Sequence, residues 1–406
     1  MPSLDSLISK QRQWLSEQNT ASEQITTLLC PYRINPLGAH VDHQGGSVMA
    51  QPIDQYTILS FSPEKLQPDD ALISVQSMQA DWPEPFQWRR SEARKSEADA
   101  NWMRYLQASI NVYNEKYPIK TSLTAAIDGT LISAGLSSSA SVILAYINAL
   151  AHANNVELTS GEQIEMCRQV ENNHMGLNNG VQDQMSIVFG RNTGLAILDV
   201  NNVSAAIAAS PDTVEEVSWV LLFSGYSREL INSGFNTRVD ECKHAASLLQ
   251  DGATRLGDVS DANATAALID KLPEPYHLRA RHFYSEVARV AEGADLWRAG
   301  NWQAFGELMN ASCQSSIHQY QSGSEALVTA HQLAKDQGKE TIYGSRFGGG
   351  GYGGCLIMLV KREHEDSVCR EMLAAYLSQF PDRQGIARCF VARPSNGIEF
   401  IENQST

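Results

Sequence analysis

The segment Gly135-Leu136-Ser137-Ser138-Ser139-Ala140-Ser141 leads directly into residues 142–150, an apolar stretch typical of a buried helix. Small side chains let the backbone of such a loop approach a ligand closely, and the first N–H groups of a helix have no partner within it. The helix dipole also favours negative charge at that end. The segment therefore predicts a phosphate-binding loop. The alternative is a serine run that only caps a buried helix, and the segment by itself favours neither.

The composition describes an ordinary globular protein. The chain has 406 residues, of which 43% are hydrophobic and 19% are charged, and this length favours two domains. No apolar run is long enough to span a membrane, and residues 1–19 lack the apolar block of a signal peptide. The seven cysteines are scattered and form no CxxC pair, as expected of reduced thiols. We therefore expect a cytoplasmic protein without a membrane partner.

The net charge of −15 argues against a nucleic-acid partner, because a protein that binds the phosphate backbone needs a basic face. An anionic ligand would then depend on local groups, namely backbone dipoles, a few arginines and magnesium.

Hydrophobic patterns along the chain predict an α+β protein with two domains. We expect a hairpin over residues 123–133, with Asp128-Gly129 as its turn. A largely helical region follows at residues 232–335, and Pro273 and Pro275 interrupt it. Strands are expected at residues 25–32, 56–61, 73–76, 195–200, 217–223, 355–360 and 387–391, and further helices near the N-terminus and at residues 102–113, 160–173 and 363–380.

Three polar or glycine-rich loops accompany the serine loop. Residues 33–46 contain a cation, imidazoles and the carboxylate of Asp42, which suit a hydroxylated ligand because a carboxylate can accept from two adjacent sugar hydroxyls. Residues 171–184 carry Glu171 and Asp183 on opposite sides of a glycine loop, so that one can face a metal and the other a substrate hydroxyl. Surface turns and a solvent-exposed glutamate remain the alternatives.

The third loop is the glycine cluster of residues 343–355. So many glycines indicate that the backbone approaches either the serine loop or a bound ligand, with a flexible hairpin as the alternative.

Taken together, these four segments resemble the galactokinase branch of the GHMP small-molecule kinase superfamily over nearly the whole chain. The resemblance implies a two-domain α+β fold. Its N-terminal domain, placed at residues 1–205, is similar to domain 2 of ribosomal protein S5, and its C-terminal domain, residues 206–406, is ferredoxin-like. The site is then expected in the cleft between the domains, with ATP and Mg²⁺ as the cofactors.

The resemblance also implies roles for single residues. Asp183 matches the catalytic aspartate and Arg33 its partner, while Ser139 and Glu171 match the magnesium ligands. The residues that match the ATP loop are Gly135, Leu136, Ser137, Ser138, Ser139 and Ala140.

Further matches concern the adenine and the sugar. Trp102 and Tyr105 fall where the family places aromatic residues near the adenine, although packing of a helix face on the core explains them equally well. His40, Asp42 and Gly180 fall in the sugar site.

The sugar loop departs from the family at one informative position. Galactokinases usually read Gly-Glu-His-Thr-Asp-Tyr, and this chain reads Gly-Ala-His-Val-Asp-His over residues 38–43, so that Ala39 replaces the glutamate that binds the C6 hydroxyl. A glutamate there would repel a C6 carboxylate by a few kcal/mol, on the order of a close ion pair near a protein surface. Ala39 therefore favours a uronic acid, and the loop resembles that of the galacturonokinases.

A second departure is Phe235, which stands where the family commonly has a sugar-binding tyrosine and which signals altered selectivity at C4. His40, His43 and Arg228 are the candidate cations for a C6 carboxylate by chemistry alone.

The resulting hypothesis is an ATP-dependent kinase that acts on the C1 hydroxyl of D-galacturonate, with this sugar acid and ATP as its partners and with the oligomeric state left open. The alternatives are a galactokinase or another neutral-sugar 1-kinase, and a catalytically silent sugar sensor.

Overall fold

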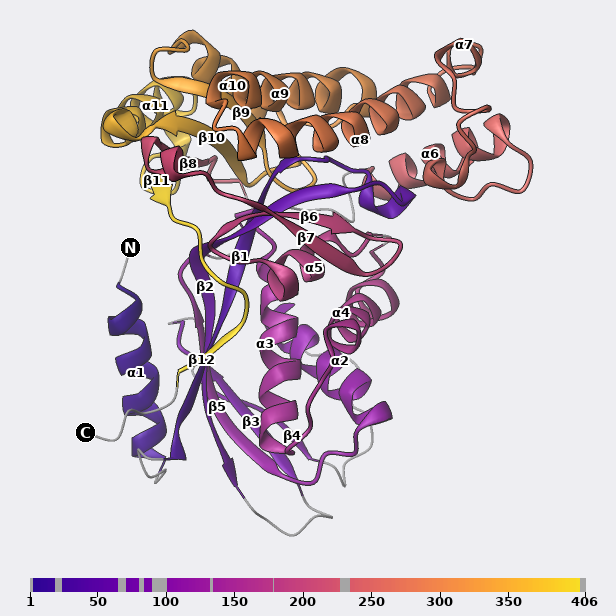
Figure 1. The fold of residues 1–406 in the computed structure, drawn as a ribbon. Coiled ribbons are helices and arrows are strands. Elements are labelled where there is room, and N and C mark those ends of the chain that lie inside the picture. Colours follow the sequence, from indigo (N-terminus) through magenta and orange to yellow (C-terminus); the bar gives the residue numbers. More distant parts are fainter. Residues whose placement is uncertain are drawn as a thin grey trace.

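The computed structural model describes residues 3–18, 24–64, 71–79, 84–89, 101–131, 134–177, 179–226 and 234–401. Its strands form two sheets, and helices pack against both. In the view of Figure 1, the second sheet and its helices lie above the first.

The first sheet has the strand order β12-β1-β2-β5-β3-β4, and β6 pairs with both β2 and β7. Neighbouring strands are antiparallel except β3 and β5. The long strand β2 pairs with three others, which places it at the centre. The strands are β1 (Thr26–Leu37), β2 (Val48–Glu64), β3 (Leu72–Ser77), β4 (Phe86–Arg89), β5 (Ser122–Gly129), β6 (Gly194–Asp199), β7 (Ser204–Ala209) and β12 (Glu399–Ile401).

Helices cover both faces of this sheet, with α1 and α3 on opposite sides in Figure 1. Helix α3 is apolar on most of its surface and is buried, as expected of a helix without a polar face. Its N-terminus is the serine loop, so the core of the first half anchors that loop. The helices of this half are α1 (Leu4–Glu17), α2 (Asn101–Lys116), α3 (Ser138–Ala153), α4 (Ser160–Gln169) and α5 (Gln182–Phe189).

The second sheet has the antiparallel order β11-β8-β10-β9, formed by β8 (Val217–Phe223), β9 (Ile342–Phe347), β10 (Cys355–Lys361) and β11 (Arg388–Ala392). With helices between β8 and β9 and between β10 and β11, this is the ferredoxin-like arrangement, and the expected fold class is confirmed. Its helices are α6 (Phe235–Leu249), α7 (Ala266–Ile269), α8 (Tyr276–Arg298), α9 (Trp302–Ser315), α10 (Glu325–Asp336) and α11 (Glu365–Gln379).

One buried apolar cluster connects the two sheets. Ile34 of β1 belongs to the same apolar cluster as Leu221 of β8 and Trp297 of α8. The buried Trp219 Nε1 donates a hydrogen bond of 2.8 Å to Gln51 Oε1 across the two sheets. The chain returns to the first sheet at β12, and we propose a division near residue 205. The remainder of β7, up to Ala209, and β12 lie beyond that division but belong to the first sheet.

Several features of the sheets differ from the expectations. The predicted hairpin turn is wrong, because Asp128 and Gly129 continue β5 opposite Ile58 and Thr57 of β2. Pairing with a long central strand outweighs the local turn preference. Residues 132 and 133, in the second arm of that hairpin, lie outside the described residues. Strands β4, β7, β9 and β12 were not anticipated either. Strand β9 occupies the start of the predicted glycine loop, and the three residues of β12 leave little pattern in the sequence.

In the described part of the chain, no helix combines the length and the apolar character that a membrane span requires. All seven cysteines are free thiols, as expected.

Candidate active site

The serine loop reaches α3 through two residues in the left-handed conformation, Gly135 at φ +73° and Ser137 at φ +64°. Ser137 holds the N-cap position, but its side chain makes no capping hydrogen bond. Its Oγ is buried and has no partner among the described residues. Side-chain capping by Ser137 therefore does not occupy the first N–H groups of α3, which suits an anionic ligand.

The glycine cluster packs directly on this loop. A Cβ added to Gly354, at φ +96°, would lie 2.7 Å from the oxygen of Ala134 and 2.8 Å from Gly135 Cα. Only a residue without a side chain permits this approach. Of the two contacts considered for the glycine cluster, the structure shows the one with the serine loop.

Arg33 and Asp183 form a buried ion pair beside the serine loop. Arg33 lies on β1 and Asp183 in the first turn of α5, and Asp183 Oδ1 accepts from Nε at 2.9 Å and from Nη2 at 2.7 Å. Arg33 is 1% exposed. Its Nη1 also reaches the oxygen of Gly135 at 3.5 Å, and its backbone N–H donates to Leu136. The arginine therefore fixes the carboxylate next to the loop that would hold the phosphates.

Ser139, in the first turn of α3, forms a second polar contact at this loop, with Glu171. Ser139 Oγ donates to Glu171 Oε1 at 2.9 Å, and Glu171 Oε2 accepts from the side chains of Asn179 and Gln184 at 2.8 Å each. Glu171 is 1% exposed and lies in a π-helical turn, Val170–His174.

Such a pair fits Mg²⁺, which binds through one or two protein oxygens together with phosphate and water. No cluster of three or more His, Cys, Asp or Glu side chains suited to a metal occurs among the described residues, so a dedicated protein cage is not the design there.

The sugar loop meets the glycine loop of residues 171–184 at Asp42. A Cβ on Gly180 would lie 2.2 Å from Asp42 Oδ2, and the same oxygen accepts from the backbone N–H of Gln182 at 3.1 Å. Burial, together with the negative charge of Asp183, raises the pKa of Asp42 to about 6. The carboxylates of Asp42 and Asp183 are therefore close enough for their charges to interact. Two neighbouring carboxylates of this kind suit a site that orients a polyhydroxylated ligand.

Buried aromatic residues line the sugar loop. The ring of His40, at φ +56°, stacks on Tyr320 with 4.1 Å between centroids, and His43 Nε2 lies 3.1 Å from the Tyr320 hydroxyl. Phe235, at the start of α6, contacts the His43 ring edge-on at 6.0 Å. Burial lowers the pKa of His43 to about 3, so its ring is neutral at neutral pH and is a poor cation for a carboxylate.

The aromatic residues predicted near the adenine and one of the predicted cations are the remaining candidates. Trp102 and Tyr105 on α2 are partly buried and pack against the core of the first half, in line with the packing alternative. Arg228, one of the three candidate cations, lies outside the described residues.

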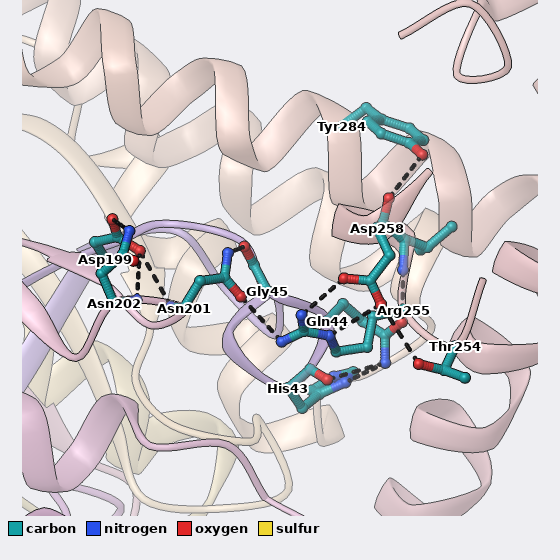
Figure 2. A network of polar contacts seen from close by, with 11 residues as sticks. His43, Gln44, Gly45, Asp199, Asn201, Asn202, Thr254, Arg255, Asp258 and Tyr284 are labelled. Atoms are coloured by element: carbon teal, nitrogen blue, oxygen red, sulfur yellow. Dashed lines mark hydrogen bonds and ion pairs between the residues drawn. The ribbon is translucent and has the colours of Figure 1, made fainter. Parts of the chain in front are cut away.

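The end of the sugar loop, at Gln44 and Gly45, is held by polar contacts that the sequence did not predict (Figure 2). Gln44 is fully buried; its Nε2 donates to His43 Nδ1 at 2.9 Å, and its Oε1 accepts from the Leu256 N–H at 3.1 Å. Asn201 binds the oxygen of Gly45 at 3.0 Å and is itself bound by Arg255 at 2.9 Å. These contacts fix the loop from the β6–β7 connection and from residues 254–258.

Gly38 and Ala39 of the same loop are held by two residues that were not predicted from the sequence. His282 Nε2 lies 2.8 Å from the oxygen of Ala39, and Glu286 accepts from the amides of Gly38 and Ala39. Both lie on α8 in the long helical region, where no local pattern distinguishes them from other helix residues.

Comparison with known proteins places this geometry in a family. Residues 104–191 match the model of the GHMP kinases N-terminal domain, and residues 294–379 match that of the GHMP kinases C-terminal domain. A galacturonokinase of Arabidopsis thaliana is 31% identical over 383 residues, covering 88% of each chain. A galactokinase of Roseiflexus is 30% identical over 376 residues, covering 91% of each chain.

A solved structure agrees with these matches. The crystal structure of Lactococcus lactis galactokinase in complex with galactose superimposes with a TM-score of 0.86 at 25% identity, covering 97% of this chain and 99% of that one. The match extends over both sheets and over the loops between them, and the chain therefore belongs to the GHMP kinase family.

Proposed function

We propose that the protein is a sugar 1-kinase, which transfers the γ-phosphoryl group of ATP to the anomeric C1 hydroxyl of D-galacturonate. The products would be D-galacturonate 1-phosphate and ADP. The observation that carries the proposal is the buried pair of Arg33 and Asp183 beside the serine loop, combined with an alanine at position 39 of the sugar loop. The relatives named galacturonokinase and galactokinase support the same class of reaction.

In the proposed reaction the C1 oxygen attacks the γ-phosphorus, its proton passes to Asp183, and the bond between the γ-phosphorus and the β–γ bridging oxygen breaks. Arg33 keeps Asp183 ionised and offsets the charge that develops on the phosphoryl group. Phosphoryl transfer asks for little covalent chemistry from the protein, so placement and electrostatics supply much of the acceleration.

The serine loop and the first turn of α3 would hold the phosphates of ATP. Ser139 and Glu171 would hold Mg²⁺, which would offset the negative charge of the ATP phosphates. Trp102 and Tyr105 stay candidates for the adenine side, since each is partly exposed.

The sugar side of the proposal depends on Ala39, Asp42 and Gly180. Asp42 would accept from two sugar hydroxyls, with the backbone of Gly180 beside it, and His40 would close the pocket. Ala39 is smaller than the glutamate usual in galactokinases and carries no negative charge. A C6 carboxylate would therefore not be repelled by the side chain at position 39. Phe235 keeps the packing of the family tyrosine but cannot bind the C4 hydroxyl, so we propose reduced discrimination between C4 epimers.

The test is ADP release by the purified protein with Mg²⁺ and ATP, comparing D-galacturonate, D-glucuronate and D-galactose at equal concentrations. We expect preference for galacturonate over galactose, since the two differ by one charge at C6. Preference for galactose would identify a neutral-sugar kinase and refute the interpretation of Ala39. A protein that binds sugar without ADP release would be a sugar sensor instead.

A further inference from the structure

Glu286 contacts the peptide that joins Gly38 and Ala39, and two arginines are linked to this glutamate. Glu286 Oε2, on α8, accepts from both amides at 3.0 Å and from Ser312 Oγ at 2.9 Å. The same hydroxyl accepts from Arg346 Nη1 at 3.2 Å, and Arg289 pairs with the other oxygen of Glu286. Glu286 and Arg346 are fully buried, and the side chain of Arg289 is 17% exposed.

The charges of this cluster do not cancel. Burial opposes ionisation of Glu286, but the interactions with His282, Arg289 and Arg346 and the hydrogen bond from the Ala39 amide hold its pKa below the usual value, so it carries one negative charge. Burial lowers the pKa of Arg346, yet guanidinium groups have intrinsic values so high that both arginines remain charged. The cluster of Glu286, Arg289 and Arg346 therefore carries one positive charge in excess.

Among the described residues, no further carboxylate forms an ion pair with Arg289 or Arg346. Burial lowers the pKa of His282 to about 4, and its neutral ring contacts the oxygen of Ala39. The charge of Arg33 is already met by Asp183. Arg346 Nη2 is buried without a hydrogen-bond partner among the described residues. A buried cation that is only partly compensated is unfavourable, and an anion close to Ala39 would relieve it.

We infer that this cluster selects a carboxylate at C6 of the sugar by supplying positive potential beneath Ala39. The inference rests on the proposed function, in which the C6 group lies beside position 39. In galactokinases a glutamate at that position would provide the negative charge, whereas here the substrate's carboxylate provides it. Arg289 and Arg346 act through space and through the Gly38–Ala39 peptide, so they are specificity residues rather than catalytic ones.

The experiment compares kcat/KM for galacturonate with kcat/KM for galactose in variants that change the charge of the cluster in opposite directions. Arg289→Gln removes the excess and should lower the galacturonate-to-galactose ratio about tenfold, as expected for one charge at this range. Glu286→Gln increases the excess and should raise the ratio, although turnover of both sugars falls because the loop loses its anchor. Arg298→Gln, at the surface of the same helix, should leave the ratio unchanged.

The ratio separates electrostatic selection from general damage, because both sugars use the same loops and the same ATP site. A ratio that stays constant, or that moves in the same direction in both variants, would overturn the inference and leave the proposed function standing. If Arg289→Gln does not fold, Glu286→Gln decides alone, and a ratio that is unchanged or lower rejects the cluster. Failure of the unaltered protein to phosphorylate galacturonate would instead reject the proposed function.

Discussion

Asp183 is the residue on which the proposed chemistry depends, and its role differs from that of the groups that bind ATP. Asp183→Asn keeps the size and a hydrogen-bond acceptor for Arg33 but cannot take the C1 proton. We expect ADP release to fall by about 10²- to 10⁴-fold, the usual contribution of a positioned general base. Affinity for ATP, measured by calorimetry, should stay near its normal value. A variant with near-normal turnover would remove Asp183 from the mechanism.

We expect the proposed sugar contact of Asp42 to make sugar binding dependent on pH. Because burial raises its pKa to about 6, the carboxylate becomes protonated as the pH falls through that value and loses acceptor capacity for sugar hydroxyls. KM for the sugar should therefore rise below about pH 6 while KM for ATP changes less, which initial rates across pH 5–8 would show.

Asp42→Asn provides the control for that pH profile. The variant should bind sugar weakly and without the step near pH 6. The raised pKa also sets a sign for stability: the native protein binds a proton more tightly than the unfolded chain, so this group favours folding more at pH 5 than at pH 7. The contribution of Asp42 to the thermal midpoint at pH 5 relative to pH 7 should therefore disappear in Asp42→Asn. If the difference between the two midpoints is the same in the variant as in the unaltered protein, the raised pKa of Asp42 is contradicted.

At the scale of elements, we expect the contact between the glycine cluster and the serine loop to affect how well the proposed phosphate loop binds ATP. Gly354→Ala should displace the loop, because its Cβ would meet Ala134 and Gly135 at less than 3 Å. We expect KM for ATP to rise several-fold. Gly385→Ala is the matched control, since it has a similar positive φ of +80° but no atom within 4 Å. Both variants bear the backbone penalty, on the order of 1 kcal/mol, but only the first should change KM for ATP.

At the scale of the whole molecule, the shared core predicts that the two halves unfold together. Gln51→Leu leaves the buried indole N–H of Trp219 without its acceptor between the sheets. The free energy of unfolding should fall by about 1–3 kcal/mol, the cost of an unsatisfied buried donor. Circular dichroism and tryptophan fluorescence should give one coincident urea transition.

Gln379→Leu, at the exposed end of α11, is the control and should have little effect on stability. Two separate transitions in the unaltered protein would show that the halves fold independently.

Features that depend on neighbouring residues could be predicted from the sequence, whereas features that depend on distant segments could not. The strand 217–223, the serine loop and the helix after it were predicted because periodicity and small side chains act locally. The hairpin at Asp128-Gly129 was predicted wrongly because pairing with β2 is a long-range effect. Arg33 and Asp183 were found through the family pattern of their loops, whereas their 2.7 Å contact required the fold.

The sequence by itself determined the α+β class and the family, since these depend on backbone demands and motifs within short segments. The tertiary structure alone decided which groups share an electrostatic environment. Glu286 meets the amide of Ala39 across 247 positions of the chain, and Arg346 reaches the same cluster from β9. Burial and proximity set the strength of charge interactions, and both arise only when distant segments pack together.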